Sequence, residues 1–111
     1  MTESSDLRRI VRPLDRLIFE SLLSGPKTRQ DLCLITGQED RVNRYAIERL
    51  RNQGIVIVSS SKGKGYRLAQ TAEEVKSFVN DMESRAQKAW RTAGKVRRAY
   101  GLKDQLSIPN I

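Results

Sequence analysis

Arginines recur on one side of a segment that is predicted to be helical. Arg41, Arg44 and Arg51 fall opposite the apolar residues when positions 40–54 are drawn as an α-helix. A guanidinium is a planar group that can grip a guanine edge or a phosphate with two hydrogen bonds. The spacing therefore predicts a helical surface suited to a polyanion, with Arg41 and Arg44 in the first turns.

Neighbouring polar residues of this segment are further candidates. Glu48 can accept a hydrogen bond from a cytosine amine, or pair with Arg44 at i−4, which is the commoner arrangement. Asn43 can read adenine or help to cap the helix. Tyr45 lies at the edge of the basic face. We count all three as candidate contact residues.

Three helices are predicted before residue 55, and each has a start signal and a stop signal. Apolar residues at helical spacing give each helix one buried face, and we interpret Cys33 as a core residue rather than a reactive thiol. The first helix begins at Pro13 and stops at Ser24-Gly25-Pro26. The second begins with a capping box at residues 28–31 and ends at Thr36-Gly37. The third has its N-cap at Asp40 and its C-cap at Gly54.

A basic β-hairpin is predicted after the third helix. Residues 55–58 are all β-branched, as in a strand, and residues 66–69 read as the returning strand. Lys62, Lys64 and Arg67 can contact phosphates, although a solvated hairpin is the alternative interpretation. The amide groups near Thr28 and Arg29, where the second helix starts, can also hold a phosphate.

Three helices followed by a hairpin form the layout of a winged helix-turn-helix domain. We therefore expect a mainly α fold with a small β-hairpin, in which this domain covers residues 13–70 and follows a basic flexible arm at residues 1–12. In such a domain the third helix enters the major groove of double-stranded DNA, and the hairpin, or wing, contacts the backbone beside it.

The same region resembles a subgroup of winged helices that includes the DNA-binding domain of the biotin repressor. It also includes small proteins of phages and prophages. The resemblance covers residues 14–70, and the wing sequence GKGYRL at residues 63–68 is its most specific part. The chain is more similar to the phage type, in which a helix with a start like residues 71–75 follows the wing directly. This resemblance implies a transcription regulator or a replication-accessory, origin-binding protein.

The charge of the chain agrees with a nucleic-acid partner. It has 21 Lys and Arg against 13 Asp and Glu, which gives a formal net charge of +8. An RNA-binding protein is one alternative, but aromatic residues make up only 5% of the chain and single strands need a stacking platform. A protein–protein interaction module is the other, and its signature is an apolar patch on the third helix, where the arginines lie.

Other chemistry lacks candidate residues. The sequence has no histidine, one cysteine, no nucleophile–base pair and no P-loop, so we expect no catalytic residue, cofactor, metal or small-molecule ligand. Neither a membrane span nor a signal peptide is visible, and we expect a cytoplasmic protein.

A long helix is predicted over residues 71–101, before a tail at residues 102–111. Its apolar residues alternate by four and three positions, which is the seam of a coiled coil and predicts a homodimer. The alternatives are a bend at Gly94 that folds the helix back, and contact of its basic second half with DNA. The predicted dimer residues are Val75, Val79, Met82, Ala86, Ala89, Trp90, Ala93 and Val96.

Overall fold

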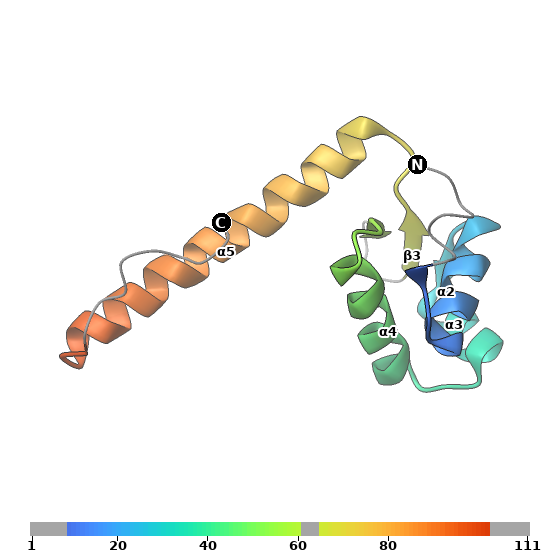
Figure 1. Ribbon diagram of the computed structural model, residues 1–111, viewed down its shortest axis with the longest axis horizontal. Helices are drawn as coiled ribbons and strands as arrows, with labels where there is room; N and C mark the ends of the chain where they lie inside the picture. Colours follow the sequence, from blue (N-terminus) through green and yellow to red (C-terminus); the bar gives the residue numbers. More distant parts are fainter. Residues whose placement is uncertain (1–8, 61–64, 103–111) are drawn as a thin grey trace. The chain divides into compact units, whose positions relative to one another are not determined.

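The chain forms two compact units in the computed structural model, which describes residues 9–60 and 65–102; the first unit ends at Ala72 (Figure 1). The expected mainly helical class, with a small sheet and a long C-terminal helix, is confirmed. The elements are α2 (Pro13–Leu23), β1 (Lys27–Thr28), α3 (Arg29–Thr36), α4 (Asp40–Asn52), β2 (Ile57–Ser59), β3 (Gly65–Leu68) and α5 (Ala72–Ala99).

The predicted helix limits are confirmed where local capping sets them. Pro13 opens α2, and the capping box of α3 forms as expected, with the Asp31 amide donating to Thr28 Oγ1 at 2.9 Å. Gly37 ends α3 with a φ of 71°, a left-handed conformation that glycine adopts at low cost. The predicted N-cap at Asp40 is wrong: Glu39 is the N-cap residue, and the Asp40 carboxylate is bound by Arg29 instead.

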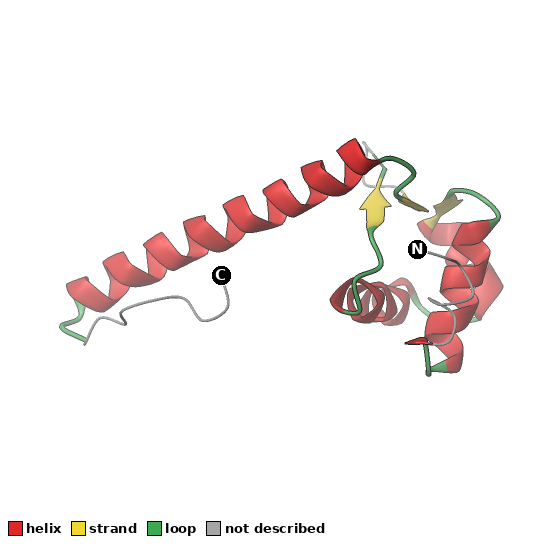
Figure 2. Ribbon diagram, turned by 45° about the horizontal axis from the view of Figure 1, so that its top comes forward, coloured by secondary structure: helices red, strands yellow, loops and turns green. Residues whose placement is uncertain are grey.

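The sheet has one strand more than the predicted hairpin. Its order is β1-β3-β2, and both pairings are antiparallel (Figure 2). Strand β1 has only two residues, too few for a recognisable alternation in the sequence. The first hairpin strand begins at Ile57, two residues after the predicted start at Ile55. Ile55 is buried in the core instead, and its amide donates to the Leu50 carbonyl.

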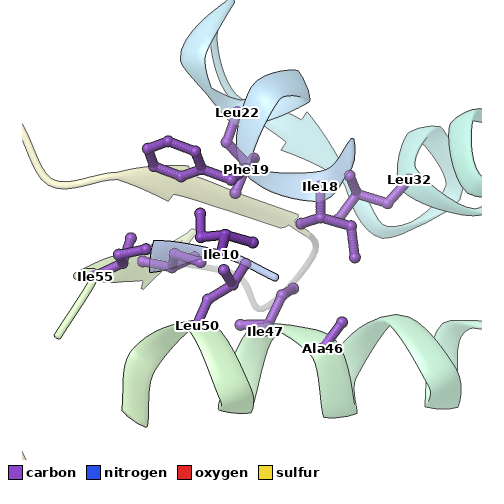
Figure 3. Close-up of a cluster of buried hydrophobic side chains, with 10 residues drawn as sticks. Ile10, Ile18, Phe19, Leu22, Leu32, Ala46, Ile47, Leu50 and Ile55 are labelled. Carbon is purple, nitrogen blue, oxygen red and sulfur yellow. The ribbon is translucent and has the colours of Figure 1, made fainter. Parts of the chain in front are cut away.

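The core of the first unit lies between α2, α3 and α4. Figure 3 shows Ala46, Ile47 and Leu50 pointing from α4 toward the side chains of α2, and all three are at most 1% exposed. The predicted apolar face of α4 is thus confirmed for these residues. Val42, predicted on the same face, is only half-buried.

The predicted flexible arm is wrong for Arg9 and Ile10. Ile10 is 1% exposed and belongs to the core cluster, and the Arg9 guanidinium donates to the Gln53 carbonyl at 2.9 Å. An apolar side chain that gains a full set of core contacts is held in place by its burial. The rest of the predicted arm, residues 1–8, lies outside the described residues.

An ion pair with a buried carboxylate and a half-buried guanidinium joins α2 to α4. The Arg49 guanidinium donates to both carboxylate oxygens of Asp15, at 3.0 and 2.8 Å, and the Asp15 side chain is 1% exposed. The hydrogen bonds to Asp15 raise the pKa of Arg49. No local pattern in the sequence predicts this pair, because its two residues lie 34 positions apart.

Helix α5 is continuous over 28 residues, so the bend considered at Gly94 is wrong (Figure 1). Gly101 follows it with a φ of 70°, as a helix terminator does. Over residues 9–60 and 65–102, none of the helices has both the length and the apolar content that a membrane crossing needs.

The backbones of β3 and β1 approach closely at Gly65, which pairs with Thr28. A Cβ atom at this position would lie 2.5 Å from the Lys27 carbonyl oxygen and 3.0 Å from the Thr28 Cα atom. Both neighbours are backbone atoms that cannot rotate away. Glycine is therefore required at residue 65 for β1 and β3 to pair.

Gly65→Ala should destabilise the first unit. Overpacking against fixed atoms costs about 1–3 kcal/mol, so we expect thermal unfolding of the first unit, followed by tyrosine fluorescence, to shift downward by several degrees. Gly94→Ala is the matched control, since only flexible arginine ends lie within 4 Å of its added Cβ. Equal midpoints for the Gly65→Ala variant and the unmodified chain would contradict the close approach.

Candidate nucleic-acid interface

The exposed side of α4 and the hairpin strands border a hollow of about 440 Å³, which we call the α4 hollow. Two of its residues, Ser59 and Tyr66, come from the hairpin, and neither was predicted as a contact residue. Tyr66 belongs to the predicted returning strand, but the four residues of β3 show no alternation that could have marked its side of the sheet. The lining residues are Arg41, Arg44, Tyr45, Ile47, Glu48, Arg51, Ser59 and Tyr66.

The packing of α4 decides which side chains reach this hollow. Ala46, Ile47 and Leu50 are buried, so the helical period places positions 41, 44, 45 and 48 on the outer face. The Arg44 side chain is 56% exposed and Tyr45 is 55% exposed. The structure thus brings four of the predicted contact residues together on one rigid helix.

Arg41 is oriented by Tyr45, one turn further along α4. Its guanidinium lies over the tyrosine ring, 5.8 Å from the centroid, and Nε is 3.4 Å from the hydroxyl oxygen. A cation over an aromatic face is attracted to the ring while its outer N–H groups stay available. Tyr45 therefore acts on Arg41 as well as lining the hollow.

Asp40 links Arg29 of α3 to the start of α4. The Arg29 Nε donates to Asp40 Oδ1 at 3.0 Å, and a second Arg29 N–H group donates to Oδ2. Arg44 Nε lies 3.4 Å from the same oxygen, so Arg44 pairs with Asp40 rather than with Glu48, its predicted partner. The hydrogen bonds from Arg29 lower the pKa of Asp40, and the same contact raises the pKa of Arg29.

Asn43 is not available to a ligand, and its assignment as a contact residue is wrong. It is 1% exposed, with Oδ1 3.0 Å from the Thr36 hydroxyl and Nδ2 3.7 Å from Cys33 Sγ. A buried amide needs such partners. Asn43 therefore fixes the angle between α3 and α4. Cys33, predicted in the core, is half-buried beside it.

Arg51 lines the α4 hollow but is bound to the sheet. Two of its N–H groups donate to the Ile57 carbonyl oxygen, at 3.0 and 2.7 Å, and one of them lies 3.5 Å from Ser59 Oγ. These bonds fasten β2 to the end of α4. Arg51 is consequently a positioning residue for the hairpin more than a ligand contact.

The capping box of α3 uses one of the amide groups of the predicted phosphate site, that of Thr28. The Thr28 amide donates to Asp31 Oδ2 at 3.0 Å, and this hydrogen bond lowers the pKa of Asp31. A carboxylate thus occupies the position where a phosphate was expected. The Arg29 side chain is bound to Asp40. Binding of a phosphate by the other amide groups at the start of α3 stays a prediction.

The predicted wing contacts are only partly within the structure. Lys62 and Lys64 lie outside the described residues. Arg67 is half-buried on β3, where it lies opposite Val58 of β2 in the antiparallel register. It lines a separate hollow of about 170 Å³ that also contains Pro26 and Lys27. Among the predicted wing residues that the structure describes, none reaches the α4 hollow.

The Arg29–Asp40 contact predicts a specific acid sensitivity. Because the pKa of Asp40 is lower in the folded chain, its stabilising contribution is complete above the unfolded value of about 4 and is lost as pH falls through the folded value. In Asp40→Asn, the free energy of unfolding in urea should therefore fall less between about pH 6 and pH 2.5 than in the unmodified chain.

Arg29→Met tests the same contact from the other side. It removes the main cation near Asp40, so it should reduce the acid-dependent loss of stability by a similar amount. Asp31 remains in both variants with its own lowered pKa, and some acid dependence will persist. The same acid-dependent loss in both variants as in the unmodified chain would contradict the assignment.

No protein-family model, curated protein or solved structure matches this chain. The interface is therefore interpreted from its own geometry, in which Arg41 and Arg44 stand on the outer face of α4 beside the hairpin.

Proposed function

We propose that the first unit binds double-stranded DNA, with α4 in the major groove and the hairpin beside it. The observation that carries this proposal is the row of Arg41, Arg44 and Tyr45 on the outer face of α4, where it borders the α4 hollow. A major groove about 12 Å wide admits one α-helix, and guanidinium groups bind its guanine edges in pairs of hydrogen bonds.

The order of the elements supports a winged helix-turn-helix fold, which we propose for this unit. Strand β1 lies between α2 and α3 in the chain and pairs with β3, giving the order β1-β3-β2. The turn between α3 and α4 covers residues 37–39 and begins with left-handed Gly37, as helix-turn-helix turns often do. The resemblance to biotin-repressor-type and phage winged helices agrees with this, and we keep a regulator or replication-accessory protein of a phage or prophage as the biological proposal.

Glu48 favours reading of bases over a general affinity for phosphate. It supplies the one carboxylate in the lining of the α4 hollow. Phosphate repels a carboxylate, whereas the amine of cytosine donates to it in the major groove. A face with two arginines and one glutamate can therefore distinguish base pairs. A purely electrostatic surface has no use for the glutamate.

The test begins with selection of bound sites from a pool of random duplexes, followed by affinity measurements on the selected site and a scrambled one. Arg44→Ala, and Arg41→Ala to a lesser degree, should reduce the preference between the two sites by about 1–3 kcal/mol. A lost base contact lowers affinity only for the selected site. An equal fall in both affinities would make these arginines phosphate contacts.

Arg16→Ala is the matched control for the arginine variants. Arg16 is an exposed α2 arginine that pairs with Glu20 at i+4 and does not line the α4 hollow. Its replacement removes the same charge, so it should leave the site preference unchanged. A loss of preference equal to that of Arg44→Ala would place the effect in net charge instead of the α4 surface.

The affinity for duplex DNA should fall steeply with salt. Each neutralised phosphate contributes about 0.9 to the slope of log affinity against log salt concentration, and the net charge of +8 favours several such contacts. The same titration with duplex RNA of matched sequence tests the RNA alternative, because its deep, narrow major groove excludes side chains. A flat slope for DNA, or tighter binding of RNA, would contradict the proposal.

A further inference from the structure

Helix α5 carries a row of apolar side chains that its own unit leaves exposed. Val75 is 38% exposed, Val79 44%, and Met82 and Val96 are each 50% exposed. A helix of this length is stabilised mainly by packing of its apolar face. We define the α5 seam as the row that alternates by four and three positions: Val75, Val79, Met82, Ala86, Ala89, Ala93, Val96 and Tyr100.

We infer that the α5 seam packs antiparallel against the α5 seam of a second copy, with Val79 opposite Val96 and Met82 opposite Ala93. Spacings of three and four are those of a left-handed coiled coil, so the row faces its partner along the whole helix. In the heptad repeat abcdefg, Val79, Ala86, Ala93 and Tyr100 are a positions and the other seam residues are d positions. In this register every layer joins an a position of one helix to a d position of the other. The remaining layers are Val75 with Tyr100 and Ala86 with Ala89.

The sizes of the seam residues favour this register. Each Met82 meets an alanine, and the central layers contain only alanine, so the two helices stay close from one methionine to the other. In a parallel pair, Met82 would meet Met82 directly beside layers of alanine on alanine. A wide layer next to a narrow one would leave voids, which cost packing energy.

The charges along α5 also favour an antiparallel partner. Residues 73–83 carry four carboxylates and one lysine, whereas residues 85–98 carry six basic side chains and no carboxylate. An antiparallel pair places the acidic segment beside the basic segment of the other helix, with Arg97 at the edge of the seam. A parallel pair would place each segment beside its own copy, and like charges at this distance repel.

One edge of the seam supplies a specific contact for this orientation. The Arg97 guanidinium lies over the Trp90 ring, 5.0 Å from the centroid, and so reaches back toward the middle of α5. Both residues occupy e positions, as does Glu83. Antiparallel helices bring e positions together, so Glu83 of one copy lies beside the Trp90–Arg97 pair of the other. In a parallel pair, Glu83 would face Phe78 instead.

Cross-linking of single cysteines tests the orientation in the full chain, without DNA. Cys33→Ser removes the native thiol, and Val79→Cys and Val96→Cys each add one thiol in the seam. A short bis-maleimide should join the two variants when they are mixed and should leave each variant alone unlinked. Identical thiols in the antiparallel pair are separated by about 25 Å along the helix, beyond the reach of the reagent.

Each other outcome overturns the inference. Linkage of either variant to itself would indicate a parallel pair, and a dimer that gives no mixed product would exclude this register. A monomer mass in sedimentation equilibrium at tens of micromolar would exclude the pairing itself. That result would direct the basic half of α5 toward another partner, such as DNA backbone, and it leaves the proposed role of α4 untouched.

Exchange of charges gives an independent test of the Glu83–Arg97 contact. Glu83→Arg and Arg97→Glu should each raise the dimer dissociation constant several-fold, and the double variant should recover most of the loss because both contacts re-form with reversed sign. Glu73→Arg with Arg98→Glu is the control, since these positions lie on the outer side of the seam. The absence of recovery in the double variant would overturn the contact.

Discussion

The ion pair of Asp15 and Arg49 fixes the orientation of α4, and the outer face of that helix depends on it. Asp15 lies on α2 and is fully buried, and its carboxylate accepts two hydrogen bonds from Arg49. Rotation of α4 would leave a buried carboxylate without its cation, which costs several kcal/mol. The same contact therefore holds Ala46, Ile47 and Leu50 inward while Arg41 and Arg44 stand outward.

The arginines of α4 and its surroundings consequently divide into two groups. Arg49 and Arg51 bind protein groups, one in α2 and the other at the Ile57 carbonyl of β2, and they set the helix and the hairpin relative to one another. Arg41 and Arg44 line the α4 hollow. The Asp40 carboxylate is shared by Arg29 and Arg44, and this contact orients the Arg44 side chain at the start of α4.

Local signals in the sequence predicted the helices well, because proline, capping boxes and left-handed glycine act within a few residues. The distinction among arginines could not be predicted, since Arg44, Arg49 and Arg51 look alike until α2 and β2 pack beside them. The burial of Ile10 and Asn43 depends on distant partners in the same way. Strand β1 was missed because pairing with β3, not its own two residues, makes it a strand.

The two-sided character of α4 has a consequence for how its preference can diverge. Residues 41, 44, 45 and 48 share the outer face and contribute nothing to the apolar core, whereas Asn43 and Arg49 hold the scaffold from the other side. Evolution, or a library randomised at those four positions, can explore new ligand preferences while the fold stays constant. The proposed recognition and the architecture can thus be inherited separately along one helix, on opposite faces of the same thirteen residues.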